Sequence, residues 1–199
     1  NSAPSRSLSS SPSSPSPSPL AASITKCGNA RQWVSVLQLL RDASQPGSRV
    51  EITVFTAAIS ACGKGMQWQQ ALSLLRSMAA EKVEPNVFSY GAGISACEKG
   101  MQWRRALSLL SELWEVRLEP NTIIYNSAVS ACGKGERWQH AMSLLGEMGG
   151  AKLEPNVISY SATISAFEKS GQWQKALSLL GRMGGAKVEL GTISYNAAI

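Results

Sequence analysis

The chain has 199 residues, with 19 basic and 13 acidic side chains, a formal net charge of +6 at pH 7 and a pI of about 9.3. No apolar run approaches the roughly 20 residues of a membrane-spanning helix, so membrane insertion is not expected. The excess of basic charge weakly favours an anionic partner.

The first segment, residues 1–23, is rich in Ser and Pro and almost lacks bulky apolar side chains. Such a composition cannot bury a core, so we expect this segment to be disordered. No acidic residue precedes Asp42, whereas Arg6 and Lys26 are basic. Sequence of this kind is typical of an organelle transit peptide, and a plain Ser/Pro-rich linker between domains is the alternative.

The rest of the chain is periodic. Tryptophans recur every 35 residues without an insertion or deletion, at Trp33, Trp68, Trp103, Trp138 and Trp173. A single globular core has no reason to place its largest side chain at a constant interval, whereas a stack of identical supersecondary units does. Because these tryptophans share a face with Ala, Leu and Met, packing between helices is favoured over a role as stacking platforms.

Two helices are predicted within each unit. Tyr90, Ile94 and Cys97 follow the i, i+4, i+7 spacing of one helix face, and an apolar stripe that starts at Trp103 predicts a second helix. Gly100 lies between them, and we interpret it as a helix stop in the left-handed cap conformation. The Glu-Pro-Asn sequence at the end of a unit then supplies an N-cap for the next first helix.

Complete units cover residues 52–86, 87–121, 122–156 and 157–191. A degenerate unit occupies residues 24–51, and a truncated unit, residues 192–199, stops within its first helix. The incomplete last unit and the first residue, Asn1, lead us to expect a piece of a longer protein. The predicted fold is an all-α, right-handed α-solenoid of helix-turn-helix repeats, whose first helices line a concave groove.

Residues that could carry chemistry have simpler explanations. Cys27, Cys62, Cys97 and Cys132 occupy one helical position of successive units, no CxxC pair exists, and Phe167 takes the next place. Buried thiols are therefore favoured over metal ligands or disulfides. The single histidine, His140, lies off the apolar stripe, which predicts a solvated side chain. We expect no enzyme activity, no metal and no cofactor in this stretch.

Four segments of each unit carry a family resemblance. In the second complete unit they are Val87-x-x-Tyr90, Ser95-Ala96-Cys97-x-Lys99-Gly100, Ala106-Leu-Ser-Leu-Leu110 and Glu119-Pro-Asn121. From residue 24 to residue 199 the chain resembles the pentatricopeptide repeat. Tetratricopeptide repeats run 34 residues and carry their tryptophan in the first helix, whereas here it opens the second. The resemblance implies binding of single-stranded RNA, about one base per repeat, in a chloroplast or mitochondrion, with the plastid favoured.

The resemblance also implies which residues contact RNA. The fifth and last residues of a unit would read the base, and these pairs are Thr56 with Asn86, Gly91 with Asn121, Asn126 with Asn156, and Ser161 with Gly191, while Asn196 begins a fifth pair. By the family's code Thr with Asn selects A, and Asn with Asn selects C or, less strongly, U. The two glycines depart from the pattern. For the asparagines, helix capping alone is the alternative.

Two further rows complete the implied site. The second residues of the units, Thr53, Phe88, Ile123, Ile158 and Ile193, would form walls between which bases lie, and packing against the preceding loop is the alternative. The lysines near the end of each first helix, Lys64, Lys99, Lys134 and Lys169, would meet phosphates. A favourable interaction of each lysine with the helix dipole explains them equally well, and both roles can coexist.

The predicted function is therefore sequence-selective single-stranded RNA binding in organellar RNA processing, stability, editing or translation. RNA-processing proteins are expected as further partners. The competing class is a protein–protein scaffold of tetratricopeptide type, which would hold a peptide in the same groove.

Overall fold

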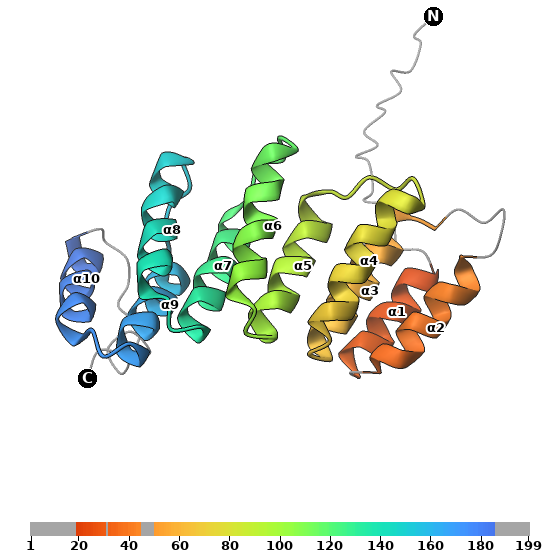
Figure 1. Ribbon diagram of the computed structural model, residues 1–199, viewed down its shortest axis with the longest axis horizontal. Helices are drawn as coiled ribbons and strands as arrows, with labels where there is room; N and C mark the ends of the chain where they lie inside the picture. Colours follow the sequence, from red (N-terminus) through yellow and green to blue (C-terminus); the bar gives the residue numbers. More distant parts are fainter. Residues whose placement is uncertain (1–18, 31, 45–49, 186–199) are drawn as a thin grey trace, which may run out of the picture.

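The computed structural model describes residues 19–30, 32–44 and 50–185, and every regular element in these ranges is an α-helix. The helices follow one another as pairs along the long axis of the molecule (Figure 1). They are α1 (Pro19–Asn29), α2 (Trp33–Ala43), α3 (Ile52–Lys64), α4 (Trp68–Ala80), α5 (Val87–Lys99), α6 (Trp103–Glu115), α7 (Thr122–Lys134), α8 (Trp138–Gly150), α9 (Val157–Lys169) and α10 (Trp173–Gly185).

From α3 onward the pairs repeat in strict register. The first helices begin at residues 52, 87, 122 and 157, and the second helices begin at residues 68, 103, 138 and 173, so each step is 35 residues. The second helix of each pair begins with a tryptophan, including α2, which begins at Trp33. The prediction of an all-α solenoid of helix pairs is confirmed.

The ordered helices begin earlier than the sequence suggested. Helix α1 starts at Pro19, within the stretch that we expected to be disordered, and residues 1–18 lie outside the described ranges. Proline suits the first position of a helix, because its missing N–H would have no partner there. Ala21 and Ile24 are 4% and 0% exposed and join the core. The expectation of disorder is therefore wrong for residues 19–23, where one apolar turn is enough to extend α1.

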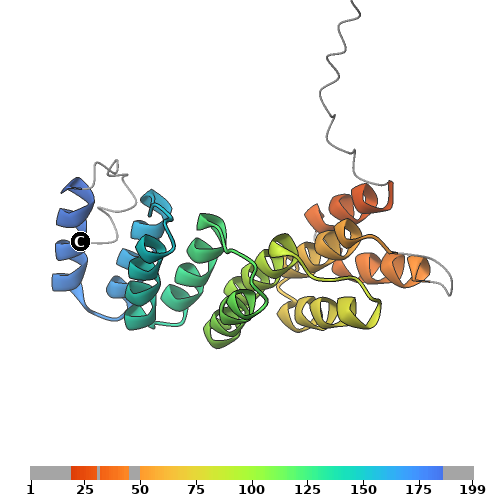
Figure 2. The ribbon, with the colours of Figure 1, turned by 90° about the horizontal axis from the view of Figure 1, so that it is seen from above.

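The first helices form a continuous row, because α1, α3, α5, α7 and α9 each contact the next one along. We call this set the first-helix row. Each second helix from α2 to α8 packs against its own first helix and the next first helix, so that α4, for example, contacts both α3 and α5. The view from above shows the same succession from α1 to α10 (Figure 2).

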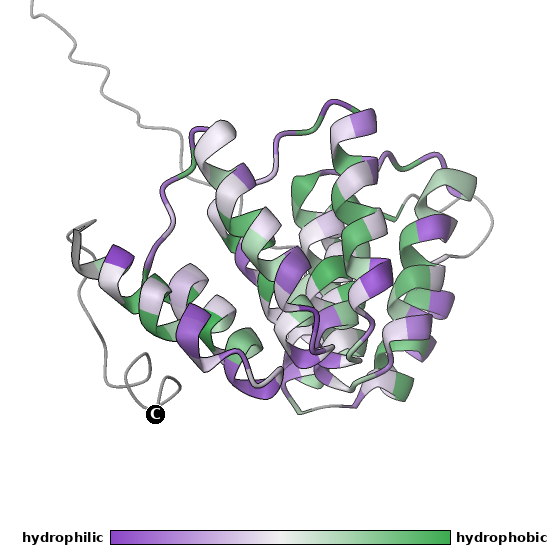
Figure 3. Cartoon of the chain, turned by 60° about the vertical axis from the view of Figure 1, so that its left-hand side comes forward, coloured by the Kyte–Doolittle hydropathy of each residue, from purple (hydrophilic) through white to green (hydrophobic). Residues whose placement is uncertain are grey.

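The apolar side chains repeat inside this frame. The Ile/Val position of the first helices is fully buried in every described unit, at Ile24, Ile59, Ile94, Val129 and Ile164. Each helix carries hydrophobic and hydrophilic residues together (Figure 3), as expected for helices that bury one stripe and solvate another. None of the helices in the described part of the chain is long and apolar enough to cross a membrane.

The cysteine position is also a core position. Cys62, Cys97 and Cys132 are free thiols with no exposed surface, and Phe167 fills the same place at 2% exposure. Burial raises the pKa of Cys62 and Cys97 to about 11 and that of Cys132 to about 12. Cys27 in α1 is half-buried. The interpretation of this row as packing residues is confirmed, and no metal-binding cluster of His, Cys, Asp or Glu occurs among the described residues.

The glycines that recur at the end of each first helix are needed for a different reason from the one predicted. Gly100 has φ −81° and is not left-handed, whereas the next residue, Met101, has φ 56°. A Cβ at Gly100 would lie 2.4 Å from Cδ1 of Trp68, which is shorter than real side chains allow. Glycine is needed here because an indole ring from the preceding unit lies on the backbone. Our left-handed assignment for Gly100 is therefore wrong.

The same contact recurs along the array. Trp33 lies against Gly65, and Trp103 lies against Gly135 with a distance of 2.4 Å to the hypothetical Cβ. In the fourth complete unit Ser170 takes the glycine's place, and Gly171, one residue later, has φ 66°. The half-buried rings of Trp68, Trp103 and Trp138 pack against the core, while Trp173 is 60% exposed. The tryptophans therefore connect one unit to the next rather than filling the centre of their own helix pair.

The tryptophan–glycine contact predicts unequal effects of adding one methyl group. Gly100→Ala should lower the free energy of unfolding by about 1–3 kcal/mol, because the new Cβ overlaps the Trp68 ring. Gly146→Ala, within α8, meets nothing within 4 Å and should raise it by about 0.5–1 kcal/mol. Urea denaturation of both variants checks this, and equal effects would show that the indole does not constrain position 100.

The buried thiols predict low reactivity in the folded protein. With a pKa of about 11, only about one Cys97 thiol in a thousand is ionised at pH 8, and only the thiolate reacts. Mass spectrometry after iodoacetamide treatment should show at most one modified cysteine, Cys27, in the native chain and four after denaturation. Rapid native modification of Cys62, Cys97 or Cys132 would contradict this assignment.

Candidate nucleic-acid interface

One face of the first-helix row carries exposed apolar side chains at a fixed interval. Phe88, Ile123 and Ile158, the second residues of α5, α7 and α9, are 71%, 74% and 63% exposed, and Thr53 of α3 is exposed too. Packing against the preceding loop would have buried them, so that alternative is wrong for these positions. Ile193, the fifth member, lies outside the described residues.

A hollow between α7 and α9 brings the predicted side chains together. It has a volume of about 360 Å³ and lies beside Ile158. Ser161, the fifth residue of its unit, and the two lysines Lys134 and Lys169 line the same space. An apolar wall, a hydroxyl and two cationic side chains thus surround one opening on the first-helix row. Such a combination can stack against a base and attract a phosphate.

The four lysines all end a first helix, where a cation favours the helix dipole. Their side chains are in two different states. Lys64 donates a hydrogen bond to Oδ1 of Asn29, and Lys134 pairs with Oε1 of Glu98 at 2.9 Å. Lys99 and Lys169 are exposed and make no hydrogen bond or ion pair with another residue in the described ranges.

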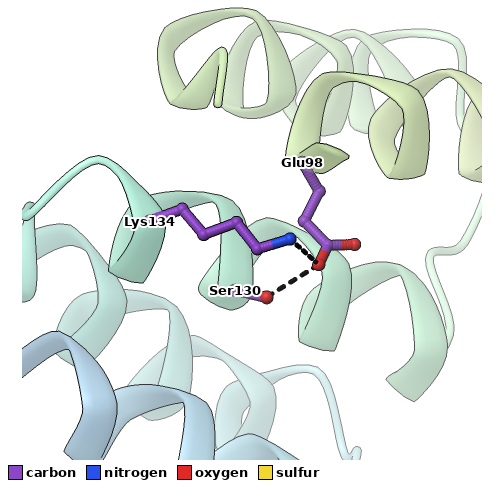
Figure 4. Close-up of polar contacts among 3 residues, drawn as sticks. All are labelled: Glu98, Ser130 and Lys134. Carbon is purple, nitrogen blue, oxygen red and sulfur yellow. Dashed lines mark hydrogen bonds and ion pairs between the residues drawn. The ribbon is translucent and has the colours of Figure 1, made fainter. Parts of the chain in front are cut away.

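Glu98 is a residue that the sequence analysis overlooked. Its Oε1 accepts a hydrogen bond from Oγ of Ser130 at 2.8 Å as well as the one from Lys134 (Figure 4). The Glu98 side chain is only 19% exposed, and that of Lys134 is 37% exposed. The contact joins α5 to α7 across the boundary between two units.

The asparagines at the ends of the units cap helices. Asn86 accepts from the backbone N–H groups of Phe88 and Ser89, and Ser89 Oγ accepts from the Asn86 N–H in return. Asn156 and Ser159 form the same reciprocal capping box on α9. Asn121 accepts from the N–H of Ile124 alone. The capping role is confirmed, and it uses only the amide oxygen, so the Nδ2 donors of Asn86 and Asn121 remain available for a base.

One predicted base-reading pair is brought into direct contact. Nδ2 of Asn126 donates to Oδ1 of Asn156 at 3.3 Å, and Oδ1 of Asn126 accepts from Ser159 Oγ at 2.6 Å. Asn126 is only 8% exposed and Ser159 is fully buried. The pair therefore belongs to a three-residue network that also caps α9, and Asn126 retains one free N–H for recognition.

The other predicted readers are less constrained. Thr56 is half-buried and donates its hydroxyl to the Ile52 carbonyl at 2.8 Å, so its oxygen can still accept. At Gly91 an added Cβ would lie 3.2 Å from Cγ1 of Ile124, which leaves little room for a side chain. No hydrogen bond joins Thr56 to Asn86 within the described chain. Gly191 and Asn196 lie outside the described residues.

Three partners of the predicted residues were missed, and two of them had a visible signal. Ser89 and Ser159 follow a unit-ending asparagine by three residues, which is the spacing of a capping box. Glu98 had a weaker signal: the position before the lysine alternates as Gly63, Glu98, Gly133 and Glu168. That the carboxylate reaches the next unit could not be read from the alternation.

Other polar side chains lie away from the exposed apolar row, where the first helices pack against the second helices. Tyr90 donates to Oε1 of Glu112 in α6 at 3.0 Å, and burial, followed by this hydrogen bond, raises the Tyr90 pKa to about 12. Trp114, which stands outside the 35-residue series of tryptophans, is 46% exposed. His140 is exposed, as predicted, with its ring centroid 5.1 Å from that of Trp103.

Known folds share this architecture. The crystal structure of the pentatricopeptide repeat protein PPR10 in complex with an 18-nucleotide psaJ RNA element is 24% identical, with a TM-score of 0.78, and the match covers 90% of this chain and 26% of PPR10. PPR10 from maize gives a TM-score of 0.68 at 20% identity, over 90% of this chain and 26% of that one. The chain thus spans about a quarter of PPR10's length.

A third structure matches over nearly its whole length. The pentatricopeptide domain of Arabidopsis thaliana protein-only RNase P 1, in complex with tRNA, is 13% identical with a TM-score of 0.74, and the match covers 89% of this chain and 93% of that domain. At these identities the likeness shows the fold. No curated protein sequence matches the chain.

Fold and periodicity define an α-solenoid of 35-residue helix pairs. Sequence-family models identify which one: the pentatricopeptide repeat domain matches residues 38–100, the PPR repeat family matches residues 120–167, and the PPR repeat matches residues 158–188. The chain belongs to the pentatricopeptide repeat family, as its motifs had indicated.

The exposed apolar row predicts that these side chains contribute little to folding. Phe88→Ala should change the free energy of unfolding by less than about 0.5 kcal/mol, since the ring is 71% exposed. Ile94 lies on the buried face of the same helix, α5, so Ile94→Ala should lower the free energy of unfolding by about 2–5 kcal/mol. Thermal or urea unfolding compares the two, and a large loss for Phe88→Ala would mean that the row supports the fold.

Proposed function

We propose that this chain binds single-stranded RNA along the first-helix row, with about one base held per repeat. The observation that carries the proposal is the hollow between α7 and α9, where Ile158, Ser161 and Lys169 meet. Each corresponds to one of the three roles that recognition of a single strand requires: a stacking surface, a polar reader and a phosphate contact.

The exposed side chains make sense as base-stacking walls. Large apolar side chains that are mostly exposed lose favourable free energy of burial unless something covers them. Phe88, Ile123 and Ile158 recur at the interval of the helix pairs, so a ligand with its own regular repeat of flat apolar faces can cover all of them. A single RNA strand has that property, because each nucleotide carries a base.

The proposed readers are the fifth and last residues of each unit. Thr56 with Asn86 would select A, and Asn126 with Asn156 would select C or, less strongly, U, by resemblance to the family. The Gly91 and Ser161 units have no assigned preference. Four units define a site of the form 5′-A-N-(C/U)-N-3′, which is short, so selectivity would depend on further repeats or partner proteins.

Two of the similar structures are described as RNA complexes, PPR10 with a psaJ RNA element and the protein-only RNase P 1 domain with tRNA. Their solenoids support the same use of this fold here. The mechanism proposed is passive: the array holds a strand, and thereby masks it or marks it for RNA-processing proteins. A plastid or mitochondrion is the proposed location, supported by the Ser/Pro-rich, acid-poor segment before α1.

Selection from a randomised single-stranded RNA pool, in parallel with single-stranded DNA, tests the proposal. We expect enrichment of A and C/U two positions apart. Phe88→Ala should weaken binding by about five- to 160-fold, because stacking on one base contributes about 1–3 kcal/mol. Val116→Ala is the matched control, since Val116 is 50% exposed but lies at the end of the second helix α6. If the unchanged chain and the Val116→Ala control both fail to bind RNA, the peptide-binding scaffold is favoured.

A recoding variant tests the base-reading positions separately from affinity. Thr56→Asn converts the first complete unit from a Thr/Asn to an Asn/Asn pair, so its preference should change from A to C or U while the third unit is unaffected. The same selection experiment reads this out. An unchanged preference at the first position would contradict the assignment of Thr56.

A further inference from the structure

The lysines that the proposed RNA site depends on are not equivalent, and the difference comes from the residues behind them. A lysine at the end of one first helix reaches back to the end of the preceding first helix. Lys64 contacts Asn29, and Lys134 contacts Glu98. Both partners lie at the end of the preceding first helix, and each supplies a side-chain oxygen to the ammonium group.

Lys99 and Lys169 have no such partner. At the end of the first helix that precedes Lys99, the equivalent positions are occupied by Gly63 and Lys64. The first helix that precedes Lys169 ends in the same Gly-Lys sequence. Neither glycine nor lysine offers a side-chain acceptor. Glutamate in place of glycine explains why Lys134 is held while Lys99 and Lys169 are free, and Asn29 in place of a lysine explains why Lys64 is held. Held and free lysines therefore follow each other along the row.

The surroundings of Glu98 favour its ion pair with Lys134 over a contact between Lys134 and a phosphate. Its half-buried carboxylate accepts from both Ser130 and Lys134, and these two residues also line the hollow between α7 and α9 (Figure 4). If Lys134 turned to a phosphate, the carboxylate would lose its cation while a second anion came close. Both effects oppose the change, because a half-buried anion needs a partner and like charges repel.

We propose that Glu98 withholds Lys134 from RNA, so that a bound strand is held at its phosphates by Lys99 and Lys169, on every second repeat. This inference rests on the proposed function and assigns Glu98 as a positioning residue within it. The exposed apolar row keeps the 35-residue interval, whereas the free lysines recur at twice that interval. Bases would then be contacted at each repeat and phosphates at alternate repeats.

The salt dependence of RNA affinity tests the proposal directly. Each phosphate contact on a single strand contributes about 0.7 to the slope of log affinity against log salt. For the 199-residue chain and a labelled, mixed-sequence single-stranded RNA, Lys99→Ala and Lys169→Ala should each lower that slope by about 0.7. Lys134→Ala should leave the slope nearly unchanged, because Lys134 makes no phosphate contact to lose.

Releasing the lysine should have the opposite effect. Glu98→Gln should steepen the slope by about 0.7 and tighten binding several-fold at about 50 mM salt. The gain should vanish in Glu98→Gln/Lys134→Ala. Glu168→Gln is the matched control, because it makes the same change in net charge at the equivalent position, and Glu168 has no ion pair with another described residue. Glutamine can still accept from Ser130, and thermal unfolding confirms that the variant is folded.

The outcomes separate this inference from the proposed function. RNA binding in which Lys134→Ala lowers the slope as much as Lys99→Ala, or in which Glu98→Gln behaves like Glu168→Gln, overturns the inference and leaves the function standing. No RNA binding by any variant at low salt overturns both. The inference is supported if Lys99→Ala and Lys169→Ala lower the slope, Lys134→Ala does not, and Glu98→Gln steepens it.

Discussion

The contact between a tryptophan of one unit and the glycine at the end of the next unit's first helix constrains three successive steps of the array, at Gly65, Gly100 and Gly135. Trp68 on Gly100 and Trp103 on Gly135 bring backbone and indole closer than any side chain would permit. The contact recurs at one interval, so it sets the spacing of successive first helices. Every other row, the buried isoleucines, the thiols and the exposed apolar side chains, inherits its register from that spacing.

That constraint explains why the functional face can be regular without being rigidly specified by its own residues. Ile123 and Ile158 are exposed and make no packing contribution that would fix their places, yet α7 and α9 present them at equivalent positions. The buried side holds the helices, and the exposed side is free to vary. Proteins that bind extended ligands gain from this separation, because recognition residues can change while the core is preserved.

The sequence predicted the array well because its period is strong: helix pairs, the tryptophans that open second helices and the buried cysteines all follow from residues that recur at one position. The left-handed assignment of Gly100 failed, because the reason for a glycine can be a neighbour that lies far away in sequence. Helix α1 began early, since a single apolar turn outweighed the Ser/Pro-rich composition before it. The pairing of Lys134 with Glu98 depends on a side chain reaching between units, which no periodicity within one unit contains.

The network of Asn126, Asn156 and Ser159 has a consequence for how such an array can evolve. Asn156 ends one repeat, where it would take part in reading a base, and begins the next, where it caps α9. Helix caps accept few residue types, chiefly Asn, Asp, Ser, Thr and Gly, and a poor cap destabilises a helix by about 0.5–2 kcal/mol. The set of residues available for recognition at this position is therefore narrowed in advance by the folding of the neighbouring repeat. Helix stability alone thus restricts the last residue of a repeat to a few residue types, before any RNA is present.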